Sequence, residues 1–307
     1  MKINLLFRVS VAAFVICSCK QEKKSETSTI FQQTWYAGKA ELSSYTLQQS
    51  RYGEIRNGEA VLIFVTEDFS TDKLVKLDDP GKTSNKLRVL KMNMTKKFFT
   101  GVYPYSMMLS VFTPVSNDGK EKTLKVDCSS QEWCGQTYSQ LLLKGNNYHW
   151  QLHSYFEKEG EQEKELDNDL LEDELWNRIR INPATLPTGK ISILPGLLWQ
   201  RLSHNSIRKE NAVLSLSGAG SNGMDSSIKI YSIEYPSSDR TLKIYFNDFF
   251  PYEILGWEET YPDGFGKDKK MLTTKAVRKK ITWLDYWKHN ALADSTYRDT
   301  LQLMHYE

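Results

Sequence analysis

Three glutamates in the last third of the chain come closest to a catalytic set. Glu253, Glu258 and Glu259 lie among aromatic residues, and glycoside hydrolysis uses two carboxyl groups roughly 5 to 10 Å apart as acid and base. Glu258 and Glu259 are adjacent, so on a strand their side chains point to opposite faces of the sheet. A periplasmic hydrolase that uses these carboxylates is therefore the alternative to a non-catalytic binding or assembly module.

Two further patterns suggest metal or phosphate chemistry. His149 and His153 are four residues apart within an alternating segment, and on a strand that spacing separates them by roughly 13 Å, too far to share one zinc ion. Residues 218–223 match the dinucleotide motif G-x-G-x-x-G, but a strand pattern follows where a helix is required, so we predict a hairpin loop. The acidic run around Asp167 lacks the glycine of a calcium loop at its sixth position, Glu172. We expect no metal and no cofactor.

Cys128 and Cys134 are six positions apart. In an oxidising compartment two such thiols normally pair, and we predict a disulfide that staples the loop between them. A redox-active pair is the alternative, but the spacing is not Cys-x-x-Cys.

The first residues predict export. Lys2 and Arg8 precede a short apolar stretch, which is the pattern of a signal peptide and is too short for a stable membrane crossing. The stretch ends in Ile16-Cys17-Ser18-Cys19, which resembles the lipobox of bacterial lipoproteins. We expect a lipoprotein signal peptide over residues 1–18, lipid on Cys19 as the link to the membrane, and, because Lys20 follows, an outer-membrane position facing the periplasm.

Charge and composition limit the partners. The full sequence has 40 basic and 38 acidic residues, and removal of residues 1–18 takes away two of the basic ones. The mature chain then has no net charge and no general attraction to nucleic acid, so we expect no such partner. Polar residues 19–33 predict a disordered tether. Aromatic residues make up 12% of the chain, which is typical of β cores and of sugar, peptide or lipid sites.

The remaining residues, 34–307, predict a single large β-rich domain. Its halves, 34–156 and 181–307, contain alternating and β-branched segments, with a hairpin over 136–156, a strand pair over 231–246 and a long final strand over 271–283. An amphipathic helix over 167–180 joins the halves, since Leu171, Leu175 and Ile179 share one stripe. A short helical end is expected near 286–303.

The predicted fold class is mainly β with one or two helices (α+β). The order of elements is similar to that of the curved antiparallel half-barrels of periplasmic lipid-handling proteins. We therefore expect a large curved antiparallel sheet or half-barrel, crossed by the amphipathic helix.

Several segments resemble uncharacterised envelope lipoproteins of Bacteroidota, some of which are labelled "septum formation inhibitor Maf". The segments are Trp35 to Glu41, Arg51 to Arg56, Ala60 to Phe69, Leu175 to Arg180 and Pro251 to Trp257. The resemblance implies a cell-envelope location and no specific activity. Together with the lipobox and the aromatic residues, it leads us to expect a lipid-anchored module that binds an apolar or glycan ligand or an envelope protein.

Overall fold

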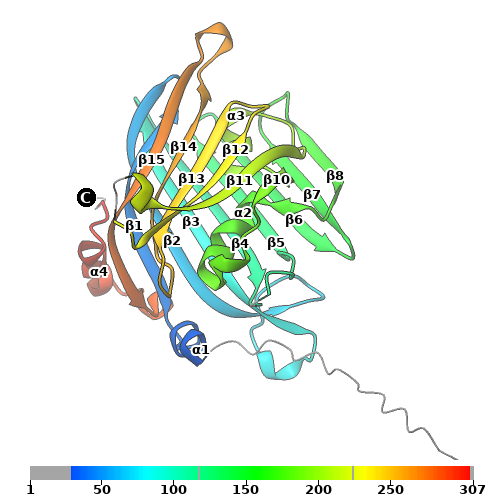
Figure 1. Cartoon of the computed structure of the whole chain (residues 1–307), viewed down its shortest axis with the longest axis vertical. Coiled ribbons are helices and arrows are strands. Elements are labelled where there is room, and N and C mark those ends of the chain that lie inside the picture. Colours follow the sequence, from blue (N-terminus) through cyan, green and yellow to red (C-terminus); the bar gives the residue numbers. More distant parts are fainter. Residues whose placement is uncertain (1–28, 117, 223–224, 305–307) are drawn as a thin grey trace, which may run out of the picture.

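The computed structural model describes residues 29–116, 118–222 and 225–304. The predicted signal peptide, Cys19 and residues 20–28 of the predicted tether lie outside these ranges. Most described residues belong to one large open sheet (Figure 1). Its strands are β1 (Ala40–Arg51), β2 (Glu54–Ser70), β3 (Lys86–Thr100), β4 (Tyr103–Pro114), β5 (Lys125–Glu132), β6 (Gly135–Lys144), β7 (Asn147–Ser154), β8 (Glu161–Asp167), β9 (Leu170–Leu171), β10 (Gly189–Leu194), β11 (Glu210–Gly218), β12 (Ile228–Tyr235), β13 (Arg240–Asn247), β14 (Ile254–Asp263) and β15 (Lys270–Leu284).

The sheet has 15 strands in the order β8-β7-β6-β5-β4-β3-β2-β1-β15-β14-β13-β12-β11-β10-β9. All neighbours are antiparallel except β9 and β10. Both predicted sequence halves contribute to this one sheet, because the first strand pairs with the last from Ala40 opposite Leu284 to Gln48 opposite Lys275. The predicted mainly β, antiparallel class is therefore confirmed.

The two edges of the sheet approach each other at one corner. Edge strands β8 and β9 are separated in sequence only by residues 168–169, which span at most about 11 Å. Lys209, just before β11, lies 2.8 Å from the carboxylate of Asp167 and 2.9 Å from that of Asp169. At this corner the end of edge strand β8 lies beside the segment before β11, which belongs to the other end of the strand order. The two edge strands, β8 and β9, do not pair with each other.

The acidic segment corrects the predicted helix over 167–180. Residues 161–167 form edge strand β8, and helix α2 covers Glu172–Ile181. Charged side chains suit an exposed edge strand because they discourage pairing with another chain. Leu170 and Leu171 then pair with β10 before the helix begins.

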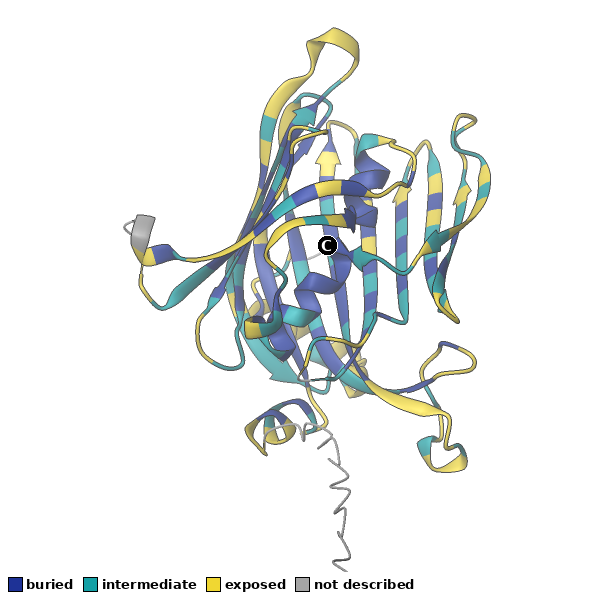
Figure 2. Ribbon diagram, turned by 45° about the vertical axis from the view of Figure 1, so that its right-hand side comes forward, coloured by how far each residue is buried: buried dark blue, intermediate teal, exposed yellow. Residues whose placement is uncertain are grey.

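Helix α2 is buried almost all round (Figure 2). On one side, Asn177 Nδ2 donates to the carbonyl oxygens of Leu90 in β3 and Val111 in β4, at 3.0 and 3.2 Å. On another side, Glu172 forms an ion pair with Arg240 of β13. The helix therefore holds two distant parts of the curved sheet together. A second buried helix, α3 (Leu197–Ser203), has no counterpart among our predicted elements.

The first helix corrects the predicted tether over residues 19–33. Thr29–Trp35 forms α1, in which Phe31 and Trp35 are buried. Phe31 lies 6.2 Å from Phe250, and Trp35 lies 5.1 Å from Trp283, measured between ring centroids. These aromatic contacts attach α1 to the folded domain.

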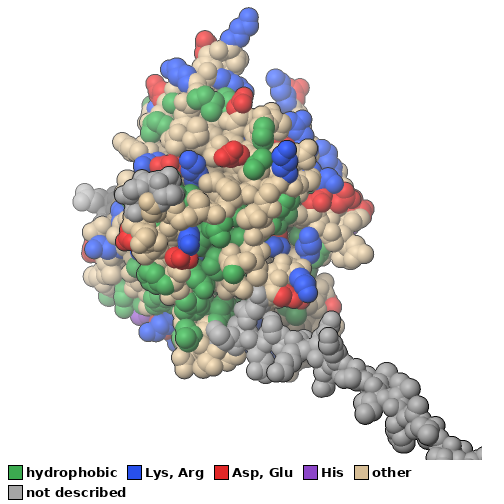
Figure 3. Space-filling view, viewed as in Figure 1, with side chains coloured by type: hydrophobic (Ala, Val, Ile, Leu, Met, Phe, Trp, Pro, Cys, Tyr) green, Lys and Arg blue, Asp and Glu red, His purple; other side chains and the backbone are tan. Residues whose placement is uncertain are grey.

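The chain ends in short helical pieces, as predicted for 286–303. They are three 3₁₀ or α turns that include α4 (Thr296–Thr300). Charged side chains of both signs are scattered over the face shown in Figure 3, and hydrophobic side chains gather at its lower centre. No helix in the described ranges is both long and apolar enough to cross a membrane.

Candidate ligand-binding cleft

The three predicted carboxylates do not form a catalytic pair. Glu259 is buried and lies 2.7 Å from Arg240, whereas Glu258 lies 2.9 Å from Lys275 and accepts a hydrogen bond from Tyr245. Their different surroundings confirm that the two side chains point to opposite faces. Glu253, in the loop before β14, lies 2.8 Å from Arg278. Each carboxylate is thus engaged in its own ion pair.

Arg240 is the centre of a buried charge network between α2 and the sheet. It donates to both carboxylate oxygens of Glu172 at 2.6 Å and to Glu259 at 2.8 Å. Tyr235 donates to Glu172 at 2.5 Å. Such paired hydrogen bonds offset the cost of removing these charges from water, so the network holds α2 against β12, β13 and β14.

Asp173 and Lys96 extend this network. Burial, with the negative charge of Glu172, raises the pKa of Asp173 to about 7, although its carboxylate accepts a 3.0 Å hydrogen bond from Leu197 N. Burial lowers the pKa of Lys96. Both residues line a small pocket of about 30 Å³, which is room for one water molecule rather than a ligand. We therefore assign this cluster to the packing of α2.

A much larger cleft lies between α3 and the inner face of β5, β6 and β7. Its volume is about 760 Å³, within the range of small-molecule sites. The floor comes from alternate residues of the three strands, which share one face of the sheet, and the mouth comes from turns. Floor residues are Cys128, Thr137, Ser139, Trp150 and Leu152; α3 and the following segment add Leu197, Trp199, Arg201, His204 and Ile207; the turns add Tyr52, Phe156, Glu159, Ser238, Asp263 and Phe265.

Three buried donors at the cleft wall have no partner among the described residues. They are Trp199 Nε1, Arg201 Nε and Ser238 Oγ. A buried polar group without a hydrogen bond costs about 1–3 kcal/mol. These three atoms have almost no accessible surface, so they belong to the packing behind the wall and not to its ligand-facing surface.

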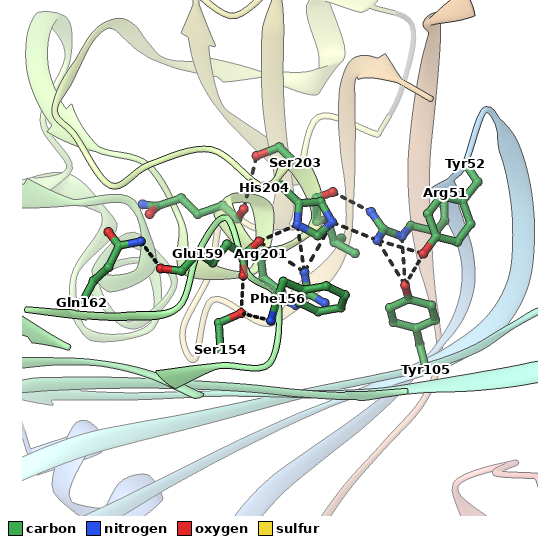
Figure 4. Close-up of polar contacts among 12 residues, drawn as sticks. Arg51, Tyr52, Tyr105, Ser154, Phe156, Glu159, Gln162, Arg201, Ser203 and His204 are labelled. Atoms are coloured by element: carbon green, nitrogen blue, oxygen red, sulfur yellow. Dashed lines mark hydrogen bonds and ion pairs between the residues drawn. The ribbon is translucent and has the colours of Figure 1, made fainter. Parts of the chain in front are cut away.

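Arg201 and His204 form one polar end of the cleft with Glu159 (Figure 4). His204 ends α3 in a left-handed conformation (φ 56°, ψ 28°), and its Nδ1 lies 2.5 Å from Glu159 Oε1. Since an ionised carboxylate can only accept, Nδ1 carries a proton in this contact. Ser154 also donates to Glu159, at 2.6 Å. Although burial works against it, these bonds and the charge of Arg201 hold the pKa of Glu159 below its ordinary value.

Arg51 reaches the same end from the last position of β1. Its guanidinium donates to the carbonyl of Leu202 at 2.5 Å and to the hydroxyls of Tyr105 and Tyr52 at 3.1 and 3.2 Å. Arg51 Nη2 lies 3.4 Å from His204 Nε2. No carboxylate among the described residues pairs with Arg51, so its positive charge is balanced only by neutral acceptors.

This arrangement suits binding better than nucleophilic catalysis. The Nε2 atom of His204 faces the guanidinium groups of Arg51 and Arg201. In the described ranges, no hydroxyl or thiol lies within hydrogen-bond distance of the imidazole. Cys128 lines the cleft as a thiol, but its burial raises the pKa well above the usual range and makes it a poor nucleophile.

The structure corrects the predicted disulfide. Cys128 and Cys134 are both free. Cys128 lies within β5 with its side chain buried, whereas Cys134 is exposed in the turn that follows Glu132. Four residues of extended strand between Cys128 and Glu132 span roughly 13 Å, far beyond the distance between the Cα atoms of a disulfide.

The remaining motifs lie elsewhere. His149 and His153 are on strand β7, as predicted, and His153 forms an exposed ion pair with Glu161. The glycine-rich motif begins at the end of β11 and leads through a 3₁₀ turn toward β12, its antiparallel neighbour, which confirms a hairpin connection. Among the described residues, no group of three His, Cys, Asp or Glu side chains is placed to hold a metal ion.

Comparison with known proteins gave no match to a family model, a curated protein or a solved structure.

Proposed function

We propose that this chain is a lipid-anchored cell-envelope protein that binds an apolar or glycan ligand without transforming it. In this proposal Cys19 carries the lipid, the folded part faces the periplasm from the outer membrane, and the sheet acts as a half-barrel crossed by α2. The cleft beside α3 is the binding site.

The observation that carries the proposal is the cleft itself. It combines a volume of about 760 Å³ with a wall that includes Trp150, Trp199 and Phe156. Aromatic rings of this kind contact both sugar faces and alkyl chains. The concave shape supports a small molecule over a protein partner.

Photo-crosslinking in intact cells tests the proposal. Leu152 lies on β7 and lines the cleft, whereas His153, next to it, is exposed and pairs with Glu161 outside. We expect a small aliphatic diazirine amino acid, close to leucine in size, in place of Leu152 to capture a small molecule, seen as an added mass on the purified protein. The same substitution at His153 should capture none. Equal capture at both positions, or none at Leu152, would refute the cleft as a binding site.

A further inference from the structure

We infer that the ligand of this cleft is an anionic amphiphile, whose phosphate or carboxylate group binds at the end formed by Arg201, Arg51 and His204. The inference rests on the proposed function, because it names the class of ligand for the same cleft. Three observations support it: the state of Arg201, the balance of charge around it, and the apolar floor.

Arg201 is a buried cation whose Nη1 lies 3.3 and 3.4 Å from the two ring nitrogens of His204. The residue is only 8% exposed. In the described ranges its guanidinium donates to no oxygen within hydrogen-bond distance, and its Nε atom is buried without a partner. The nearest carboxylate oxygen, on Glu159, is 3.9 Å away. The planar face of the group lies 4.7 Å from the ring of Phe156, so an anion would approach along the edge that carries the donors.

The charges at this end favour an anion. Arg51 and Arg201 contribute two positive charges against the one negative charge of Glu159. Both carboxylate oxygens of Glu159 are already engaged, one by His204 and the other by Ser154. A bound anion would therefore offset the excess of the two guanidinium charges over the one carboxylate that they face. Desolvated guanidinium groups are well suited to phosphate and carboxylate.

The rest of the cleft suits an alkyl chain. Cys128, Leu152, Leu197 and Ile207 line it together with Trp150, and Trp150 Nε1 already donates to Ser139 at 2.7 Å, which leaves the ring as an apolar surface. A sugar alone would leave most of this apolar floor without contact.

Calorimetric titration of the full chain in neutral phosphatidylcholine vesicles tests the inference, with protein-free vesicles as the blank. The probes are octyl phosphate, octyl glucoside and inorganic phosphate. We expect octyl phosphate to bind at least about tenfold more tightly than octyl glucoside, because a hydrogen bond to a charged group is worth about 1.5–3 kcal/mol. Inorganic phosphate, which lacks the chain, should compete only at far higher concentration.

Arg201→Gln should weaken binding of octyl phosphate by on the order of 10- to 100-fold and that of octyl glucoside by much less, because a neutral headgroup loses no charged partner. Retained glucoside binding also shows that the variant is folded. The matched control is Arg88→Gln, which removes an arginine that pairs with Asp68 on an exposed surface and should leave both probes unaffected.

The outcomes separate the two proposals. Equal affinity for octyl phosphate and octyl glucoside, or an equal loss of both in Arg201→Gln, would overturn the anionic ligand and leave a binding cleft. Inorganic phosphate that competes as well as octyl phosphate would overturn the amphiphile in favour of a free anion. Failure of all three probes, together with absence of a crosslinked molecule at Leu152, would overturn the binding function as well.

Discussion

At the residue scale, Asp173 is the ionisable group whose burial has the clearest consequence for stability. It lies among Glu172, Arg240 and Glu259, and burial raises its pKa to about 7. Between pH 4 and pH 7 the folded carboxyl therefore keeps its proton, whereas the unfolded carboxyl loses it. The folded state binds more protons in this window, so its stability falls as the pH rises, and the loss is complete above the folded pKa.

Asp173→Asn should remove this dependence. The amide oxygen can still accept the hydrogen bond from Leu197 N that the carboxylate accepts at 3.0 Å, while no charge is buried at any pH. We expect the free energy of unfolding of the variant, relative to the parent chain, to rise by on the order of 2 kcal/mol from pH 4.5 to pH 7.5. Urea denaturation at both pH values measures it, and a difference that does not change with pH would contradict the assigned cause.

The residues of the candidate cleft show why the sequence alone did not predict it. Glu159 and His204 are 45 positions apart, and Arg51 and His204 are 153 apart. No local spacing reveals such partners, and Glu159 belonged in the sequence to an acidic run. The one local signal was Arg201 followed three positions later by His204, and it becomes informative only once α3 is known to be a helix.

At the element scale, periodicity predicted the paired strands well and the short elements poorly. The hairpin of β6 and β7 and the long final strand β15 follow from alternating residues bounded by turns. Helix α3 is only seven residues long and almost wholly buried, so it has no polar stripe to reveal its period. Strand β8 was missed because its charges suit a solvated helix as well as an exposed edge.

Helix α1 provides a stability test at this scale. Trp35 is 1% exposed and packs against Trp283, and the guanidinium of Arg180 lies 5.2 Å from its ring. We expect Trp35→Ala to lower the free energy of unfolding by about 3–5 kcal/mol. Ile30→Ala, on the same helix but 63% exposed, should change it by less than about 0.5 kcal/mol. Similar effects of the two substitutions in urea denaturation would mean that α1 is only loosely attached.

At the scale of the whole molecule, the topology separates the start of the folded chain from the cleft. Strand β1 begins at Ala40, next to α1, and ends at Arg51, which lines the cleft. Twelve residues of strand extend for roughly 40 Å. In our proposal the lipid attaches near the α1 end, and the mouth of the cleft opens at the other end of β1.

The lipid anchor is tested by metabolic labelling with a palmitate analogue. We expect the parent chain to be labelled and Cys19→Ala to lose the label, because the thiol of Cys19 is the proposed attachment point. Cys17→Ala is the matched control, since it removes a neighbouring thiol of the same segment, and it should keep the label. Labelling that survives in Cys19→Ala, or that is absent from the parent chain, would contradict the proposed address.

The central claim is that the cleft beside α3 holds a ligand, and native mass spectrometry of the full chain extracted from its own membranes tests it most directly. Leu152→Trp adds a large ring to the floor of the cleft, whereas His153→Trp adds the same ring to the outer face of β7. The account predicts a bound small molecule on the parent chain and on His153→Trp, and its loss from Leu152→Trp. Equal occupancy of all three proteins, or a parent chain without any bound molecule, would contradict it.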